Sequence, residues 1–207
     1  MKPTKALHDL GQSLWIDNIT RDMLDSGTLK RYIDEYSVTG LTSNPTIFDN
    51  AISNSDSYDD EVKRLFNAGY SGEALFFELA LQDLSRAAYM LLPVHERTAS
   101  VDGYVSLEVS PLLAYDTKAT IASAKGLFER AHKPNLLIKI PGTQEGLPAI
   151  EEAIYSGVSV NVTLLFSSQH CRDAADAYMK GLERRVAEGL SPDVRSVASV
   201  FVSRWDK

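Results

Sequence analysis

The sequence contains little cysteine and no long hydrophobic stretch. Cys171 is the single cysteine among 207 residues, so an intramolecular disulfide is excluded and a reducing, cytoplasmic location is expected. No apolar run is long enough to span a bilayer, and no signal-peptide core follows the first residues. We therefore expect a cytoplasmic protein that does not insert into membranes.

Positive charge is also in short supply. Lysine and arginine total 21 against 28 aspartates and glutamates, which gives a net charge of −7 and a pI near 5.1. This balance argues against nucleic acid or an anionic membrane as a partner, although one arginine is enough to bind a phosphorylated small molecule. The four histidines are scattered without metal-ligand spacing, so we expect no metal site.

What the sequence does contain is an alternation of short apolar runs and amphipathic segments. The apolar runs predict strands at residues 13–16, 38–42, 104–109, 136–140, 158–165 and 197–202. The amphipathic segments predict helices at 26–36, 118–132, 147–155 and 168–188. Such alternation is typical of an α/β fold with a parallel sheet. Residues 49–100 break the rhythm and predict two or more helices inserted after the second strand.

One lysine interrupts an otherwise apolar run. Lys139 lies in the run LLIKI at 136–140, which is followed by a Pro-Gly pair and is typical of a strand buried on both faces. Burial of an ammonium group is costly and favours the neutral amine, which attacks ketones and aldehydes and forms Schiff bases. Two alternatives stay open for this residue: a head group that reaches solvent, or one that pairs with a carboxylate.

Every predicted strand carries a polar residue within it or directly after it. Taken singly, each has an ordinary explanation, such as a helix N-cap for Asp17, a salt-bridge partner for Glu108 or a core hydrogen bond for Asn161. In a parallel barrel, however, catalytic side chains come from the strand ends on one face, so convergence on one site explains the set better. Its members are Asp17, Thr42, Asn44, Glu108, Lys139, Asn161, Thr163, Ser199 and Arg204.

Three segments together resemble the transaldolase family, in its bacterial form within the class I Schiff-base aldolases. They are LTSNPTIF at 41–48, LIKIPGT at 137–143 and NVTLLFS at 161–167. The resemblance runs from about Leu14 to the end of the sequence, and a chance match of all three motifs in this order is improbable. It implies a (β/α)8 TIM barrel that uses no cofactor. This chain would hold about the first six βα units, with a helical insertion after strand 2.

The resemblance also implies a reaction and a role for each residue. A dihydroxyacetone unit would pass from sedoheptulose 7-phosphate or fructose 6-phosphate to glyceraldehyde 3-phosphate or erythrose 4-phosphate, in the pentose phosphate pathway. Lys139 is similar to the Schiff-base lysine, and Asp17 to the general base. Glu108 and Thr163 are similar to the pair that holds a catalytic water. The positions similar to substrate-binding residues are Thr42, Asn44, Asn161, Ser199, Phe201 and, for the phosphate, Arg204.

Other functions stay open. Fructose-6-phosphate aldolases of the same family cleave the same donor but release free dihydroxyacetone. They tend to carry Gln in place of Glu108, Tyr in place of Phe201 and no long insertion after the second strand. A second alternative is a catalytically inactive, truncated barrel that acts as a binding or assembly partner. A sugar-phosphate-binding protein with an unused site is a weaker third, because binding alone does not require a strand-buried lysine.

The sequence ends soon after the sixth predicted strand, whereas a closed barrel has eight. We expect a single barrel domain over residues 1–207, incomplete at its C-terminal end, as the leading part of a longer protein. A deliberate or proteolytic fragment and a natural short form are the alternatives. Expected partners are sugar-phosphate substrates, with no nucleic acid and no membrane. A homo-oligomer and a fused or separate isomerase domain both stay open.

Overall fold

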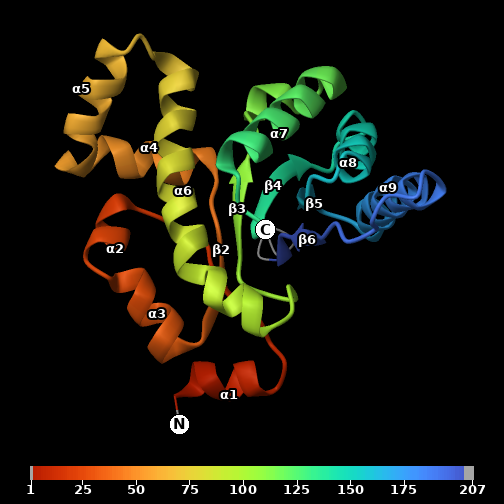
Figure 1. Ribbon diagram of the computed structural model, residues 1–207, viewed down its shortest axis with the longest axis horizontal. Coiled ribbons are helices and arrows are strands. Elements are labelled where there is room, and N and C mark those ends of the chain that lie inside the picture. The colour runs from red at the N-terminus through yellow and green to blue at the C-terminus, as the bar shows by residue number, and fades with distance from the viewer. Residues whose placement is uncertain (1, 203–207) are drawn as a thin grey trace. The chain divides into compact units, whose positions relative to one another are not determined.

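Six strands alternate with helices along the chain in the computed structural model, which describes residues 2–202 (Figure 1). The strands are β1 (Leu14–Ile16), β2 (Val38–Thr42), β3 (Tyr104–Glu108), β4 (Leu136–Pro141), β5 (Val160–Leu165) and β6 (Ser196–Val200). Their order in the sheet follows the chain, and the paired strands are parallel. The predicted α/β class is therefore confirmed, as a partial series of TIM-barrel-like strands.

The described residues divide into two compact units. The first holds the residues up to Leu107 together with Lys133–Leu136, and the second holds Glu108–His132 and the residues from Leu137 onwards. The division crosses β3 and β4, and the ladder between these strands contributes a hydrogen bond inside each unit. Val105 N donates to Asn135 O at 3.0 Å in the first, and Val109 N donates to Lys139 O at 3.1 Å in the second.

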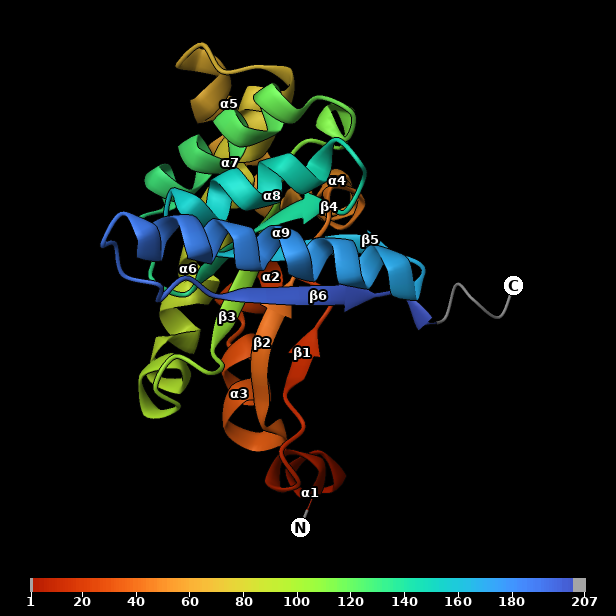
Figure 2. The same ribbon diagram turned by 90° about the vertical axis from the view of Figure 1, so that its right-hand side faces the viewer.

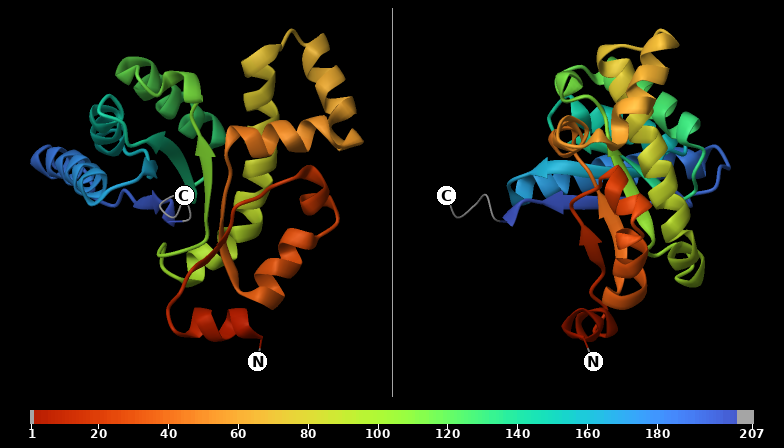
Figure 3. Two further views of the ribbon diagram at one scale, coloured as in Figure 1. Left: turned by 180° about the vertical axis from the view of Figure 1, so that it is seen from behind. Right: turned by 90° about the vertical axis from the view of Figure 1, so that its left-hand side faces the viewer.

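The first unit combines β1 to β3 with a set of helices, seen from behind in Figure 3. Three of these helices precede β2 in the chain, and the others form the insertion between β2 and β3. The elements are α1 (Pro3–Asp9), α2 (Arg21–Asp25), α3 (Thr28–Tyr36), α4 (Pro45–Ser53), η1 (Asp56–Tyr58), α5 (Asp59–Asn67) and α6 (Gly72–Arg97). The insertion has its own small core of Ala51, Tyr58, Leu65 and Leu79. Within the described residues, no helix combines the length and apolar character needed to cross a membrane.

Helix boundaries in the first unit differ from the sequence prediction in two places. The helix predicted at 26–36 is observed as α3, which begins at Thr28, and the short helix α2 just before it was not predicted. Gly27, whose φ of 73° lies in the left-handed region, separates the two and suits glycine. The insertion begins at Pro45 rather than residue 49, because Asn44 caps α4: its Oδ1 accepts a hydrogen bond from Ile47 N at 2.9 Å. Pro45 at the first helical position completes this start signal.

The second unit combines β4 to β6 with α7 (Thr117–Ala131), α8 (Gly146–Tyr155), α9 (Ser168–Ala187) and the short η2 (Pro111–Leu113). All six residues of β4 are buried. Figure 2 shows α8 and α9 side by side. Gly181 permits this approach, because a Cβ there would lie 2.8 Å from the side chain of Ile154. The absence of a side chain at position 181 thus lets α8 and α9 pack closely.

Candidate active site

Lys139 and Glu108 form a buried ion pair within the second unit. Lys139 Nζ lies 3.1 Å from Glu108 Oε2, and the two side chains are 6% and 12% exposed. Lys139 is thus buried within β4 and also paired with a carboxylate. The interpretation as a buried lysine and the alternative of a carboxylate partner therefore both apply. Transfer of one proton from Nζ to the carboxylate leaves a neutral amine beside a neutral acid. That amine has the chemistry required to attack a carbonyl carbon.

Strand register places further polar residues on the face that carries Lys139. Lys139 pairs with Asn161, and Pro141 pairs with Thr163. Paired residues of parallel strands point to the same face, as do residues two apart on one strand. Asn161 and Thr163 are both 1% exposed, and Ser199 Oγ donates to Asn161 Oδ1 at 2.8 Å. The structure therefore places Glu108, Lys139, Asn161, Thr163 and Ser199 near one another on the strands of the second unit.

The hydroxyl of Thr163 is buried and has no hydrogen-bond partner within residues 2–202. A buried polar group left unsatisfied costs about 1–3 kcal/mol, and such groups in native structures call for an explanation such as a bound water or ligand. Thr42 Oγ1, at the end of β2 in the first unit, is in the same situation. Both hydroxyls belong to residues that the sequence singled out as site candidates.

A β-bulge in β5 directs side chains just beyond Thr163. Leu164 has a φ of 61°, and the pairing with β6 shifts between Val162 and Leu165. The shift moves Leu165 to the face of Val162, because a Cβ added at Gly142 would approach both side chains, at 2.7 and 3.3 Å. In a regular strand Leu165 would instead share the face of Thr163. The bulge thus keeps a bulky apolar side chain away from the face that carries Lys139.

The remaining candidate of the second unit lies just past β6. The Phe201 ring stacks on Phe166, with centroids 5.9 Å apart and an angle of 24° between the planes. Phe166 follows β5 directly, so the two rings join the ends of neighbouring strands. Arg204, the predicted phosphate ligand, lies outside the described residues.

Three candidates belong to the first unit. Asp17 directly follows β1 and is exposed, Thr42 ends β2, and Asn44 lies two residues further on. The Asn44 side-chain oxygen caps α4, and the amide N–H groups are the remaining donors of that side chain. All three occupy carboxyl ends of parallel strands, the positions from which barrel enzymes take catalytic groups. Their roles stay predictions. In the described part of the chain, no cluster of three or more His, Cys, Asp or Glu residues could hold a metal ion.

Comparison with known proteins adds the family to this geometry. Residues 14–207 match the family model described as Transaldolase/Fructose-6-phosphate aldolase. The chain belongs to the transaldolase/fructose-6-phosphate aldolase family. A transaldolase of Thiobacillus denitrificans is 46% identical over 207 residues, which are 100% of this chain and 58% of that protein. A transaldolase of Saccharopolyspora erythraea is 47% identical over 203 residues, 98% of this chain and 55% of that protein.

Membership of the family covers the whole chain, but the chain covers only part of its relatives. Transaldolase 2 of Nostoc punctiforme is 45% identical over 197 residues, which make up 95% of this chain and 52% of that protein. The chain thus spans little more than half the length of the curated relatives it matches. The family match confirms the resemblance inferred from the three sequence motifs.

Sequence reasoning missed two features near the candidates. One is the bulge at Leu164, for which the sequence carries no signal, because leucine is not a residue that favours the left-handed region. The other is a buried polar network in the first unit, built by Arg21, Tyr58 and Asp83. A signal for it existed, since Asp83 interrupts the buried face of α6 between Leu79 and Ala87.

Proposed function

We propose that the protein acts as a transaldolase, which moves a dihydroxyacetone unit from a ketose phosphate to an aldose phosphate through a Schiff base on Lys139. The observation that carries this proposal is the buried Lys139–Glu108 pair, with Asn161 and Thr163 on the same face. A binding protein would gain nothing from burying an amine beside a carboxylate at this cost in free energy. The relatives named transaldolase support the same activity.

The proposed reaction begins with attack of the Lys139 amine on the donor ketone. The carbinolamine that forms loses water and becomes a protonated imine. Glu108 would pass protons through a water molecule to the departing hydroxyl and take them back on hydrolysis. The unpartnered Thr163 hydroxyl supports this water site, since it offers a hydrogen bond that the described protein groups do not fill. General acid–base help of this kind contributes about 10²–10⁴-fold to rate.

Carbon–carbon cleavage follows from the imine. Asp17 would take the proton from the C4 hydroxyl of the donor, the C3–C4 bond breaks, and its electron pair passes to the imine nitrogen. The first aldose leaves, and an enamine of dihydroxyacetone stays on Lys139. The enamine then attacks the aldehyde carbon of the acceptor, and the new alkoxide takes the proton back from Asp17. Hydrolysis of the imine frees the product ketose and restores the amine.

The other candidates would bind and orient the sugar phosphates. Thr42, Asn44, Asn161 and Ser199 carry the hydroxyl and amide groups suited to sugar hydroxyls. Phe201 would bound the site with an apolar ring, and Arg204 would bind the phosphate through its planar guanidinium. The proposal includes a role in the pentose phosphate pathway, a cytoplasmic location and no cofactor, with sugar phosphates as partners.

Fructose-6-phosphate aldolase is the second candidate, because the matching family model covers both activities. The two activities differ in the fate of the enamine. In a transaldolase the enamine attacks an acceptor aldose. In the aldolase the enamine is protonated, and hydrolysis of the imine releases free dihydroxyacetone. Glu108 and Phe201 favour the transferase, since the aldolases tend to carry Gln and Tyr at these positions. Relatives at 43–47% identity also carry the transaldolase name.

Trapping of the imine tests the proposal. The purified protein is incubated with fructose 6-phosphate, reduced with borohydride and digested, and the adduct is located by peptide mass spectrometry. We expect a dihydroxyacetone-derived adduct on Lys139, none in Lys139→Met, and an unchanged yield in Lys125→Met. Folded protein without an adduct on Lys139 would refute the proposal in favour of an inactive partner. Free dihydroxyacetone released without an acceptor would instead identify the aldolase.

A further inference from the structure

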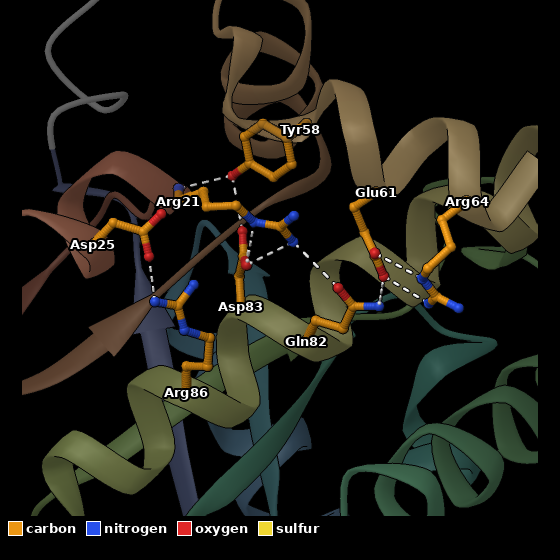
Figure 4. Close-up of polar contacts among 8 residues, drawn as sticks. All are labelled: Arg21, Asp25, Tyr58, Glu61, Arg64, Gln82, Asp83 and Arg86. Carbon is orange, nitrogen blue, oxygen red and sulfur yellow. Dashed lines mark hydrogen bonds and ion pairs between the residues drawn. The ribbon is translucent and has the colours of Figure 1, made fainter.

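A buried polar network joins the start of α2 to the helical insertion in the first unit (Figure 4). Arg21 is the first residue of α2, and its Nε and Nη2 lie 3.0 and 2.9 Å from Asp83 Oδ1 on α6. Tyr58, at the end of η1, donates from its hydroxyl to Asp83 Oδ2 at 2.8 Å. The same hydroxyl accepts a hydrogen bond from the backbone N–H of Arg21 at 2.9 Å. Tyr58 and Asp83 thus hold both the side chain and the backbone of Arg21.

The network is shielded from solvent. Tyr58 and Asp83 are fully buried, and the Arg21 side chain is 11% exposed, with its guanidinium 4.6 Å from the centroid of the Tyr58 ring. Burial and the neighbouring Asp83 carboxylate raise the pKa of Tyr58, so its hydroxyl stays protonated and donates. Buried ion pairs seldom stabilise a protein more than apolar residues of the same shape would. Their geometry is fixed, however, and fixed geometry is useful beside a reacting group.

Further contacts hold the rest of α2 to the insertion. Asp22 accepts hydrogen bonds from the hydroxyls of Ser55 and Ser57. Asp25 pairs with Arg86, as Figure 4 shows. Three of the five residues of α2 are therefore bound by side chains to residues between β2 and β3. A five-residue helix has little stability of its own. Its position depends on these contacts.

Asp17 lies on the short segment that connects the end of β1 to the start of α2. Asp17 follows the last residue of β1, and Arg21 comes four positions later. Between them, Ile19 is fully buried and Thr20 caps α2, its Oγ1 accepting from Met23 N at 3.1 Å. Four residues reach at most about 14 Å when fully extended, so Asp17 lies on a short connection. One end of this connection is held by the β1–β2 ladder and the other by Tyr58 and Asp83.

We propose that Tyr58 and Asp83 are positioning residues that fix the Asp17–Thr20 connection, so that the helical insertion sets the place of the general base. This inference rests on the proposed function, in which Asp17 accepts the proton during cleavage. Neither residue would touch the substrate. Their effect would pass through Arg21 to the start of α2, and from there along the connection to Asp17.

Two substitutions test the inference with different risks to folding. Tyr58→Phe deletes one oxygen and keeps the ring, which removes the bond to the backbone of Arg21 and one bond to Asp83. Asp83→Asn keeps the shape of the side chain and removes its charge. Tyr155→Phe is the matched control, since it also removes a hydroxyl bonded to a carboxylate, 2.6 Å from Glu188 on the second unit. Circular dichroism confirms that each variant is folded.

Three readouts separate a positioning role from general damage. Hydrogen exchange of the peptide covering residues 17–23 should speed up in Tyr58→Phe and Asp83→Asn and stay unchanged in Tyr155→Phe. Imine trapping on Lys139 should stay within about twofold of the unsubstituted protein, because that step does not use Asp17. Turnover should fall about tenfold or more at an unchanged KM, since small misplacements of a catalytic group reduce rate strongly.

The outcomes that overturn the inference differ from those that overturn the proposed function. Unchanged exchange at residues 17–23, or faster exchange with normal turnover, would overturn the positioning role while the Schiff-base chemistry stands. Equal losses of imine trapping and turnover would show general structural damage and also overturn it. Absence of the Lys139 adduct in the unsubstituted protein would overturn the proposed function itself.

Discussion

Removal of the Lys139 ammonium group tests how the buried pair is held. Lys139→Met keeps an unbranched chain of similar length in β4 but leaves Glu108, whose side chain is 12% exposed, without that cation. Breaking a buried pair by removing one partner costs about 3–5 kcal/mol. The cost at pH 7 has an upper bound of about 3.7 kcal/mol, because the carboxyl can take up a proton instead. That bound is the cost of protonating a carboxyl with the ordinary glutamate pKa of about 4.3 at pH 7, at about 1.36 kcal/mol per pH unit.

We therefore expect Lys139→Met to lower the free energy of unfolding by about 3 kcal/mol at pH 7. Loss of the Lys139 cation removes a group that favours the charged carboxylate, so we expect the cost of the substitution to be larger at pH 7.5 than at pH 5. The double variant Lys139→Met/Glu108→Gln also removes the Glu108 charge and should recover most of the loss. Urea unfolding at pH 7.5 and pH 5, followed by circular dichroism, measures all three proteins.

Lys125→Met is the control for this experiment. Lys125 Nζ lies 3.0 Å from Glu152 Oε1, but the two side chains are 36% and 27% exposed. Pairs with this access to solvent contribute about 0–1 kcal/mol. Destabilisation by Lys139→Met no greater than that by Lys125→Met would refute a buried pair whose members depend on each other. A double variant no more stable than Lys139→Met alone at pH 7.5 would refute it equally.

Three shorter predictions concern the backbone and the insertion. Leu164→Gly should change stability by less than about 1 kcal/mol, whereas Leu164→Val should destabilise more, because a β-branched residue fits poorly at the φ of 61° there; thermal unfolding compares the two. Gly40→Ala should lower the free energy of unfolding by about 1–3 kcal/mol in urea unfolding, because the new Cβ would meet the Trp15 ring. That ring is held in place by the hydrogen bond that Trp15 Nε1 donates to Asp102 Oδ1 at 3.1 Å. The Arg64 hydrogen bond lowers the pKa of Glu61 to about 2. Glu61→Gln should therefore lose about 1 kcal/mol at pH 7, and unfolding measured from pH 7 to pH 3 should show this difference shrinking below pH 4.5.

Strands and site residues could be predicted because both leave short-range signals in the sequence. The run LLIKI identified β4 and placed Lys139 inside it, and the predicted strand at 38–42 matches β2 residue for residue. Apolar runs bounded by turn residues depend on neighbours along the chain, which the sequence contains. The polar residues at strand ends followed once the parallel topology was inferred, because that topology gathers carboxyl ends along one edge of a sheet.

Features that depend on contacts distant in the sequence could not be predicted. The pairing of Lys139 with Glu108 links residues 31 positions apart, and the pattern could not choose between this pair and a head group in solvent. The short helix α2, which was not predicted, begins at Arg21, and the contacts of Arg21 with Tyr58 and Asp83 join residues 37 and 62 positions apart. Leu164 adopts a left-handed conformation that its side chain disfavours. Tertiary pairing with β6 outweighs local preference there.

The places where this chain departs from local rules argue against an inert barrel. A protein selected only for stability would satisfy Thr163, avoid a left-handed leucine at 164 and fill the site of Lys139 with an apolar residue. Each departure costs on the order of 1 kcal/mol or more, against a typical total stability of about 5–15 kcal/mol. By contrast, Arg184 on the helical face of the same unit pairs with both Glu151 and Glu152 at 3.0 Å. Such departures tend to occur at functional sites. Lys139 and Thr163 share one face, and the bulge at Leu164 keeps Leu165 off that face, which supports the proposed Schiff-base chemistry there.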